Sequence, residues 1–345
     1  MGKKRVFIIG AGASVGFNFP PGIDLLEKIY KKWENPNKEL IDLFTHIWSY
    51  LGVEHEGPTP EKSIQRYAQK LYFSGAISID DFLSKSKEQL LREFGRATIL
   101  TEILDNENKT LVKNENELFK FKDNWLRELF GRFFRFPELD DLKRFLKHNT
   151  FEFIIFNYDR CIEFFLFAAI QNYYSITKED AHKIINEIKF EHVYGKPGKM
   201  SWEEGYDVKN DVAFGQELRT DEKLKYYKKL QTITPNIKVI GEDNIPRSYI
   251  EIINSADIVY ILGYGFHSEN NRLLQFTHLN HLINQNSRTR FFITSFGLSQ
   301  HVKNYIQTNF NTAIVDEAKI YDFMHHHDIE LCADDTDTQI KITNE

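Results

Sequence analysis

The sequence predicts an α/β protein with a Rossmann-like, doubly wound and mostly parallel sheet, into which a helical segment is inserted. Two observations favour this fold. Short apolar strands near both ends of the chain are each followed by Gly, Ser or Asn residues, whereas the stretch between them runs through one helix after another. The chain has 345 residues, 41% of them hydrophobic, which is enough apolar material for one large or two modest domains.

The first predicted unit is a strand over Arg5–Ile9 that leads through a glycine-containing turn, Gly10–Ser14, into a helix from Gly22. In that helix, apolar residues recur at helical spacing, at Leu25, Leu26, Ile29, Tyr30 and Trp33. Because glycine has no Cβ, such a turn lets backbone N–H groups approach a phosphate closely. A tight turn without any ligand is an equally good interpretation of this loop alone.

Residues 35–148 are predicted to form a helical insertion. Its expected helices cover Leu40–Tyr50, 64–72, Asp80–Leu91, Ala97–Leu104, Leu118–Phe134 and Leu139–Leu146. The Asn-rich, charged stretch 104–117 predicts a loop or a short hairpin. The expected domains are therefore a core made of residues 1–34 and 149–325, the insertion, and a C-terminal tail at 326–345.

The alternation resumes with a buried strand over Phe151–Phe156 and a helix over Cys161–Ile170. Further strands are expected within 189–198, 256–274, 289–297 and 311–316. In open α/β sheets, ligands bind at the carboxyl ends of the strands. Asn157 and Asp159 stand at such an end, which makes them candidate site residues.

Composition and charge exclude several classes of protein. The net charge of -6 gives no field that would attract nucleic acid, and no apolar run approaches the ~20 residues of a membrane span. Two cysteines form neither a disulfide framework nor a cysteine zinc site, and the chain begins without signal-peptide architecture, so a cytoplasmic location is expected. Three consecutive histidines at 325–327 cannot face one ion, and His278 with His281 lacks a third ligand, so no metal is expected.

Four stretches in order, each at the end of a strand, carry a resemblance to a known family. They are GAGAS at 10–14, FNYDRCIE at 156–163, HVYG at 192–195 and LGYGF at 262–266. Together they resemble the Sir2 family, particularly the Sir2-like NADases of bacterial antiphage defence. The resemblance covers most of the chain and is weakest in the helical insertion.

The resemblance implies which residues bind and cleave NAD. The dinucleotide would be held by Gly10, Ala11, Gly12, Ser14, Pro20, Gly263, Gly265 and Phe266. Asn157 and Asp159 would face the nicotinamide ribose, and a histidine directly before a glycine would act as base. Tyr194 occupies that place here, and His192 lies two residues upstream.

Side-chain chemistry favours His192 over Tyr194 as the base. Side chains two apart on a strand point to the same face, so both residues are expected in the cleft. An unperturbed histidine titrates near pH ~6.5 and an unperturbed tyrosine near ~10. His192→Ala is therefore expected to lose most of the catalytic rate, whereas Tyr194→Phe keeps much of it.

Departures from the family pattern favour hydrolysis over deacylation. Sirtuin deacylases follow the loop's proline with Asp, Phe and Arg, whereas this chain continues from Pro20 with Pro, Gly and Ile. They also hold a module with four zinc-binding cysteines, which two cysteines cannot replace. Water is then the expected acceptor, and NAD would be cleaved to ADP-ribose and nicotinamide.

Several alternatives stay open. A domain that binds NAD or ADP-ribose without cleaving it would act as a sensor, whereas an oxidoreductase is disfavoured because a second strand ending in an acid is missing after the first helix. Asn157 and Asp159 also suit a helix cap, His192 a core position, and Gly263 with Gly265 close packing. An unrestrained NADase would deplete its own cell, so a homo-oligomer or a partner such as a helicase-like ATPase is expected to control it.

Overall fold

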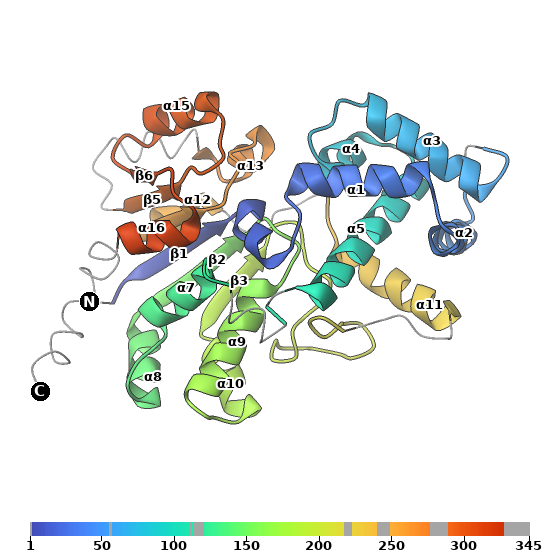
Figure 1. Cartoon of the computed structure of the whole chain (residues 1–345). Coiled ribbons are helices and arrows are strands. Elements are labelled where there is room, and N and C mark those ends of the chain that lie inside the picture. The colour runs from blue at the N-terminus through green and yellow to red at the C-terminus, as the bar shows by residue number, and fades with distance from the viewer. Residues whose placement is uncertain are drawn as a thin grey trace, which may run out of the picture.

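Six parallel strands form one sheet in the middle of the molecule (Figure 1). The computed structural model describes residues 2–54, 57–110, 112–113, 121–216, 223–239, 249–276 and 289–327. The strands are β1 (Lys4–Ile9), β2 (Thr150–Ile155), β3 (Ile188–His192), β4 (Ile258–Leu262), β5 (Arg290–Thr294) and β6 (Ile314–Asp316). Their order, β3-β2-β1-β4-β5-β6, is that of a doubly wound Rossmann-like sheet. The predicted α/β fold class is confirmed at this level.

Helices cover both faces of the sheet. Phe7 of β1 stacks between Phe153 and Tyr260 of the neighbouring strands and meets Phe133 of α7 (Trp125–Phe133) edge to face. The same face is covered by α8 (Leu139–His148), α16 (Ile320–His326) and, next to α7, α9 (Cys161–Tyr173) and α10 (Lys178–Ile185). On the opposite face lie α12 (Tyr249–Asn254) and α15 (Gln300–Asn309). Burial on both faces explains why the strands read as continuous apolar runs.

A second group of helices, which we call the helical lobe, lies beyond the carboxyl end of β1, on the right of Figure 1. It consists of α1 (Gly22–Glu34), α2 (Lys38–Leu51), α3 (Pro60–Phe73), α4 (Ile79–Lys85), α5 (Gln89–Lys109) and α11 (Lys223–Ile233). Trp33, Phe44 and Phe94 pack against one another in its interior. Two 3₁₀ turns, Ala11–Ala13 and Val15–Phe17, connect β1 to this lobe.

The lobe differs from the predicted insertion in two ways. Helices α7 and α8 fall within residues 35–148, but they cover the sheet. Helices α1 and α11 come from outside that range, yet they pack in the lobe. The expected helix over Asp80–Leu91 is broken, because Ser86 is extended (ψ 133°) and its hydroxyl accepts a hydrogen bond from the backbone N–H of Glu88. The chain is helical again from Gln89 to Lys109, so α5 includes residues 104–109 of the stretch 104–117 that was predicted as a loop.

Some predictions lie partly or wholly outside the described residues. Helix α16 ends at His326, so the predicted tail begins where this helix ends, and residues 328–345 are outside the described part. Residues 118–120 of the expected helix Leu118–Phe134, and both His278 and His281, are also outside it. Among the helices that the structure describes, none is long and apolar enough to cross a membrane.

Candidate functional site

Two glycine-containing loops meet where the strand order reverses, between β1 and β4. The backbone N–H of Gly10 donates to the carbonyl of Leu262 at 3.0 Å, and that of Gly12 donates to the carbonyl of Gly263, also at 3.0 Å. The chain connections after β1 and β4 run to opposite sides of the sheet. In doubly wound sheets, this arrangement leaves a crevice at the carboxyl ends of the two strands. The loops after β1 and β4 therefore lie at the position where doubly wound proteins bind ligands.

Close packing explains three of the glycines at this junction. A Cβ on Gly263 would lie 2.2 Å from the backbone nitrogen of Ala13, and the residue has a φ of +59°. A Cβ on Gly10 would lie 2.5 Å from the carbonyl oxygen of Gly263, and one on Gly12 would lie 2.9 Å from it. Gly263 therefore serves close packing, as the alternative interpretation expects. These three glycines are needed whether or not a ligand binds.

The other predicted binding residues have different surroundings. Gly265 faces only the ring of His267, which can move. Phe266 is buried and its ring packs against Phe276 and Phe310, so it anchors its loop to the core. Ala11 and Pro20 are partly exposed, as a ligand-facing position requires.

A cavity of about 380 Å³ opens beside the junction. Its walls come from the loops after β1 and β4, the end of β5 and the loop that follows it, the segment after β6, and residues 121–125 at the start of α7; they include Gly12, Gly263 and Thr294. The Thr294 hydroxyl accepts a hydrogen bond from the backbone N–H of Gly263 at 3.0 Å. Aromatic side chains supply much of the remaining lining, at Phe121, Trp125, Phe296 and Tyr321. The volume and the aromatic walls suit one flat, nucleoside-sized group.

Among the described residues that line this cavity, only two are charged, and they form an ion pair. Lys319 and Asp123 both line it, and the Nζ of Lys319 lies 3.0 Å from the carboxylate of Asp123. Both side chains are about half exposed. An anionic ligand could pair with Lys319 only by displacing the carboxylate of Asp123.

On the other side of the first loop, Ser14 contacts Asn157. The side-chain amide of Asn157 donates to the Ser14 hydroxyl at 2.9 Å, which links the loop after β1 to the end of β2. The Oδ1 atom of Asn157 is buried and has no hydrogen-bond partner among the described residues. Leaving a buried amide oxygen unpaired is costly, so this atom is a natural acceptor for a ligand hydroxyl or a water.

Asp159 has the capping role that the alternative interpretation assigns to it. Its Oδ1 accepts a hydrogen bond from the backbone N–H of Cys161, the first residue of α9, at 3.2 Å. Burial raises the pKa of Asp159, although hydrogen bonds from Ser14 and Cys161 oppose the shift. The carboxyl group therefore lies next to both Ser14 and the helix start.

The side chain of His192 is 2% exposed, and both of its ring nitrogens are occupied. Its Nδ1 lies 2.8 Å from the carbonyl oxygen of Asn157, and its Nε2 lies 2.7 Å from Oε1 of Glu163. Burial opposes ionisation of Glu163, yet the charges of His192 and Lys196 lower its pKa to about 2. Both ring nitrogens of His192 thus lie against oxygen atoms of the protein itself, and neither is free to face a ligand.

Tyr194 is buried too, and it points elsewhere. Its hydroxyl donates to Oδ1 of Asn270 on α13 (Ser268–Leu273), and burial raises its pKa well above the usual range. His192 contacts α9 while Tyr194 contacts α13, so the expectation that both side chains face one cleft is wrong. Strand β3 ends at His192, and the chain turns there, with the N–H of Gly195 donating to the carbonyl of His192.

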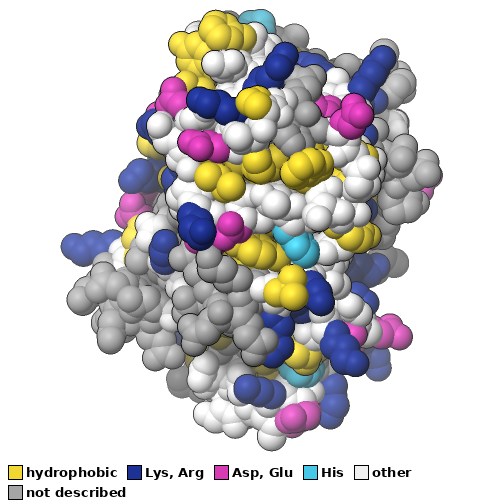
Figure 2. All heavy atoms as spheres, turned by 90° about the vertical axis from the view of Figure 1, so that its right-hand side faces the viewer, with side chains coloured by type: hydrophobic (Ala, Val, Ile, Leu, Met, Phe, Trp, Pro, Cys, Tyr) yellow, Lys and Arg dark blue, Asp and Glu magenta, His cyan; other side chains and the backbone are white. Residues whose placement is uncertain are grey.

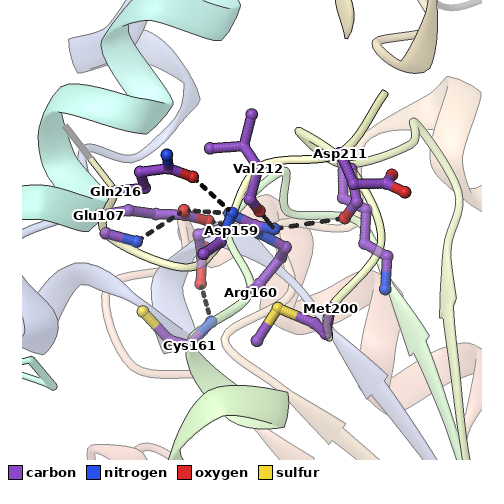
Figure 3. A network of polar contacts seen from close by, with 12 residues as sticks. Glu107, Asp159, Arg160, Cys161, Met200, Asp211, Val212 and Gln216 are labelled. Carbon is purple, nitrogen blue, oxygen red and sulfur yellow. Dashed lines mark hydrogen bonds and ion pairs between the residues drawn. The ribbon is translucent and has the colours of Figure 1, made fainter. Parts of the chain in front are cut away.

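Sequence reasoning missed the ion pair that Figure 3 shows beside Asp159. Arg160 and Glu107 are both fully buried, with Nε to Oε1 at 2.9 Å and Nη2 to Oε2 at 2.5 Å. Nη1 of Arg160 also donates to the carbonyl of Val212 at 2.6 Å. The pair joins α5 of the helical lobe to the turn after β2, and thereby fixes the segment that carries Asn157. Its signal in the sequence is Arg160, a charged residue placed directly before the apolar helix that begins at Cys161.

The described residues contain no group of three or more His, Cys, Asp and Glu side chains placed to hold a metal ion. His326 and His327 instead share one carboxylate oxygen of Asp316, at 2.7 and 3.1 Å. In comparisons with known proteins, no protein-family model matches the chain. No curated protein matches it either.

Proposed function

We propose that the protein is a Sir2-like NAD⁺ glycohydrolase that cleaves NAD to ADP-ribose and nicotinamide. The observation that carries the proposal is the position of the loop after β1. Ala13 and Val15 of this loop line the 380 Å³ cavity, while Ser14, between them, contacts Asn157. A dinucleotide lying across the loop would place one nucleoside in the cavity and the other beside Asn157.

The chemistry of the two sides fits a molecule with two unlike halves. The aromatic cavity offers stacking surfaces but few polar groups, as an adenine ring requires. The unpaired Oδ1 of Asn157 would accept a hydrogen bond from a ribose hydroxyl or from the attacking water. In the reaction, the water oxygen bonds to C1′ of the ribose and loses a proton. The C1′–N bond breaks at the same time, and its electron pair goes to nicotinamide.

The full-length protein, incubated with NAD and no added metal, is the direct test. We expect chromatography to separate ADP-ribose and nicotinamide as products, and Asn157→Ala to abolish their formation while the far-UV circular dichroism stays unchanged. Asn172→Ala, which removes an exposed amide at the end of α9, is the matched control. Full turnover by a folded Asn157→Ala protein would remove this residue from the mechanism, and a reduced cofactor would indicate an oxidoreductase.

A second candidate function is binding without cleavage, and the pairing of His192 favours it. If the family's base is unavailable, the site would still accommodate NAD or ADP-ribose and report its concentration. Calorimetry and chromatography together separate the two functions. A sensor would bind NAD measurably in the calorimeter, and chromatography would recover that NAD intact.

Control by assembly is part of the proposal, because a constitutive NADase in the cytoplasm would consume the NAD of its own cell. Large apolar side chains are exposed on the helical lobe at Tyr50, Tyr72, Phe73 and Leu224, with Phe73 82% exposed. Figure 2 shows one face of the lobe, with hydrophobic side chains in a band across its middle between charged groups. Such surface suits a second copy of the chain or a partner such as a helicase-like ATPase. Equal NAD hydrolysis by a monomer and by every assembly would exclude this control.

A further inference from the structure

A carboxylate from the helical lobe reaches the strand ends on which the proposed reaction depends. Asp80 lies in the first turn of α4, and its Oδ1 accepts a hydrogen bond from the hydroxyl of Tyr158. Tyr158 stands between Asn157 and Asp159 in the turn after β2. The start of α4 also lies against the start of α1, since Cβ of Ser78 is 4.0 Å from the place where a Cβ of Gly22 would stand. Asp80 is thus close to the end of the glycine loop and to the end of β2.

The hydroxyl of Tyr158 has two acceptors for its one proton. Besides the carboxylate of Asp80, the carbonyl oxygen of Lys238 lies 3.0 Å away. When Asp80 is ionised, Tyr158 donates to it. When Asp80 is protonated, it donates to the Tyr158 oxygen and Tyr158 donates to Lys238 instead. The hydrogen bond between Asp80 and Tyr158 can therefore form in both protonation states of Asp80, which is what a group that takes up and releases a proton needs.

The surroundings of Asp80 bring its pKa closer to neutral pH, so that both of its protonation states are accessible there. Burial raises its pKa from 3.8 to about 6, although the hydrogen bond from Tyr158 lowers it. The ionisable groups around it are Tyr158, Tyr194 and, on the same helix, Asp81, and burial raises the pKa of both tyrosines. Asp81 is paired with Lys85 at 2.6 Å. Asp80 as a whole residue is partly exposed, at the surface where the start of α4 meets the start of α1.

Resting on the proposed function, we propose that Asp80 is the general base of the hydrolysis, and that Tyr158 is the residue that positions it. His192 has no free nitrogen for this role, and Tyr194 stays neutral. A carboxylate oxygen of Asp80 takes a proton from the attacking water as the water oxygen bonds to C1′ and the electron pair of the C1′–N bond leaves with nicotinamide. Asp80 then releases the proton to solvent.

The test compares pH profiles of nicotinamide release by the full-length protein and three variants. For the wild type we expect kcat/KM to fall as the pH drops below about 6, because the base becomes protonated. Asp80→Asn is expected to lose about 10²–10⁴-fold in kcat and this acidic limb, with little change in KM. Tyr158→Phe should move the limb to higher pH, since it removes the hydrogen bond that lowers the pKa of Asp80. Asp140→Asn, which removes an exposed carboxylate in the first turn of α8, is the matched control and should change neither.

The outcomes separate this inference from the function on which it rests. A wild type that releases no nicotinamide in any assembly overturns the proposed function and the base with it. A wild type that hydrolyses NAD while Asp80→Asn keeps the rate and the acidic limb overturns only the assignment of Asp80. If Asp80→Asn fails to fold, Tyr158→Phe decides the matter, because an unmoved limb would contradict the coupling of the two residues.

Discussion

The buried pair of Arg160 and Glu107 gives the strongest stability prediction. Arg160→Met removes a fully buried guanidinium and leaves the carboxylate of Glu107 without its counter-charge. It also leaves the carbonyl of Val212 without its 2.6 Å donor. Breaking a buried ion pair from one side costs about 3–5 kcal/mol, which is a large part of the ~5–15 kcal/mol that stabilises a typical domain. We therefore expect Arg160→Met to lose at least about 3 kcal/mol of unfolding free energy.

The double variant tests whether the cost comes from the stranded charge. Replacing both partners by apolar residues is often neutral, so Glu107→Leu combined with Arg160→Met should be more stable than the sum of the single variants predicts. Some loss should remain, because an unpaired carbonyl such as that of Val212 costs about 1–3 kcal/mol. Urea unfolding followed by tryptophan fluorescence measures all three variants on one scale.

A matched exposed pair provides the control. Arg272 and Glu269 form an i,i+3 pair whose side chains are 67% and 43% exposed. Arg272→Met should change the unfolding free energy by less than about 1 kcal/mol. Equal small losses in Arg160→Met and Arg272→Met would refute the argument that burial makes the first pair indispensable.

Three further predictions concern the glycine junction, acid stability and the cavity. Gly263→Ala should unfold at clearly lower urea concentration than Gly297→Ala, because both have a positive φ but only Gly263 would place a Cβ 2.2 Å from the facing loop; similar midpoints would contradict this. Although burial raises it, the charges of His192 and Lys196 lower the folded pKa of Glu163 from its ordinary 4.5 to about 2, so its stabilisation is present above pH about 4.5 and is lost as the pH falls toward 2; Glu163→Gln should flatten the acid-unfolding curve there. Lys319→Met should weaken NAD binding measured by calorimetry, whereas Lys303→Met, outside the cavity lining, should leave it unchanged; equal dissociation constants would exclude Lys319 from anion binding.

Strand positions were predictable because they depend on local sequence, and their apolar runs are long and bounded by polar or small residues. The strand order was not, since nothing in the chain between β1 and β2 indicates that these two strands pair. The expectation that His192 and Tyr194 face one cleft failed for a specific reason. The two-residue alternation of side chains holds only while a strand continues, and β3 ends at His192 itself.

Composition also gave a wrong secondary-structure prediction where a tertiary contact determines the structure. The stretch 104–117 is rich in Asn and charge, which is typical of a loop, yet α5 continues to Lys109. Glu107 lies on that last part of the helix and is fully buried against Arg160, a residue 53 positions later. Local propensity is a weak guide when a buried ion pair of this kind holds a segment in place.

The backbone hydrogen bonds of the glycine loop limit how it could contact the proposed ligand. Backbone N–H groups of Gly10, Gly12, Ala13 and Ser14 all donate to carbonyls of the protein itself. Those of Gly10 and Gly12 hold the loop against the end of β4, whereas those of Ala13 and Ser14 close turns within the loop, so all four are already paired inside the protein. A pyrophosphate crossing this loop would have to be recognised by other groups, and the hydroxyl of Ser14 is one that also contacts Asn157. If the proposed dinucleotide binds here, the small residues of this turn would allow its approach, and side chains beside the turn would have to supply the specificity.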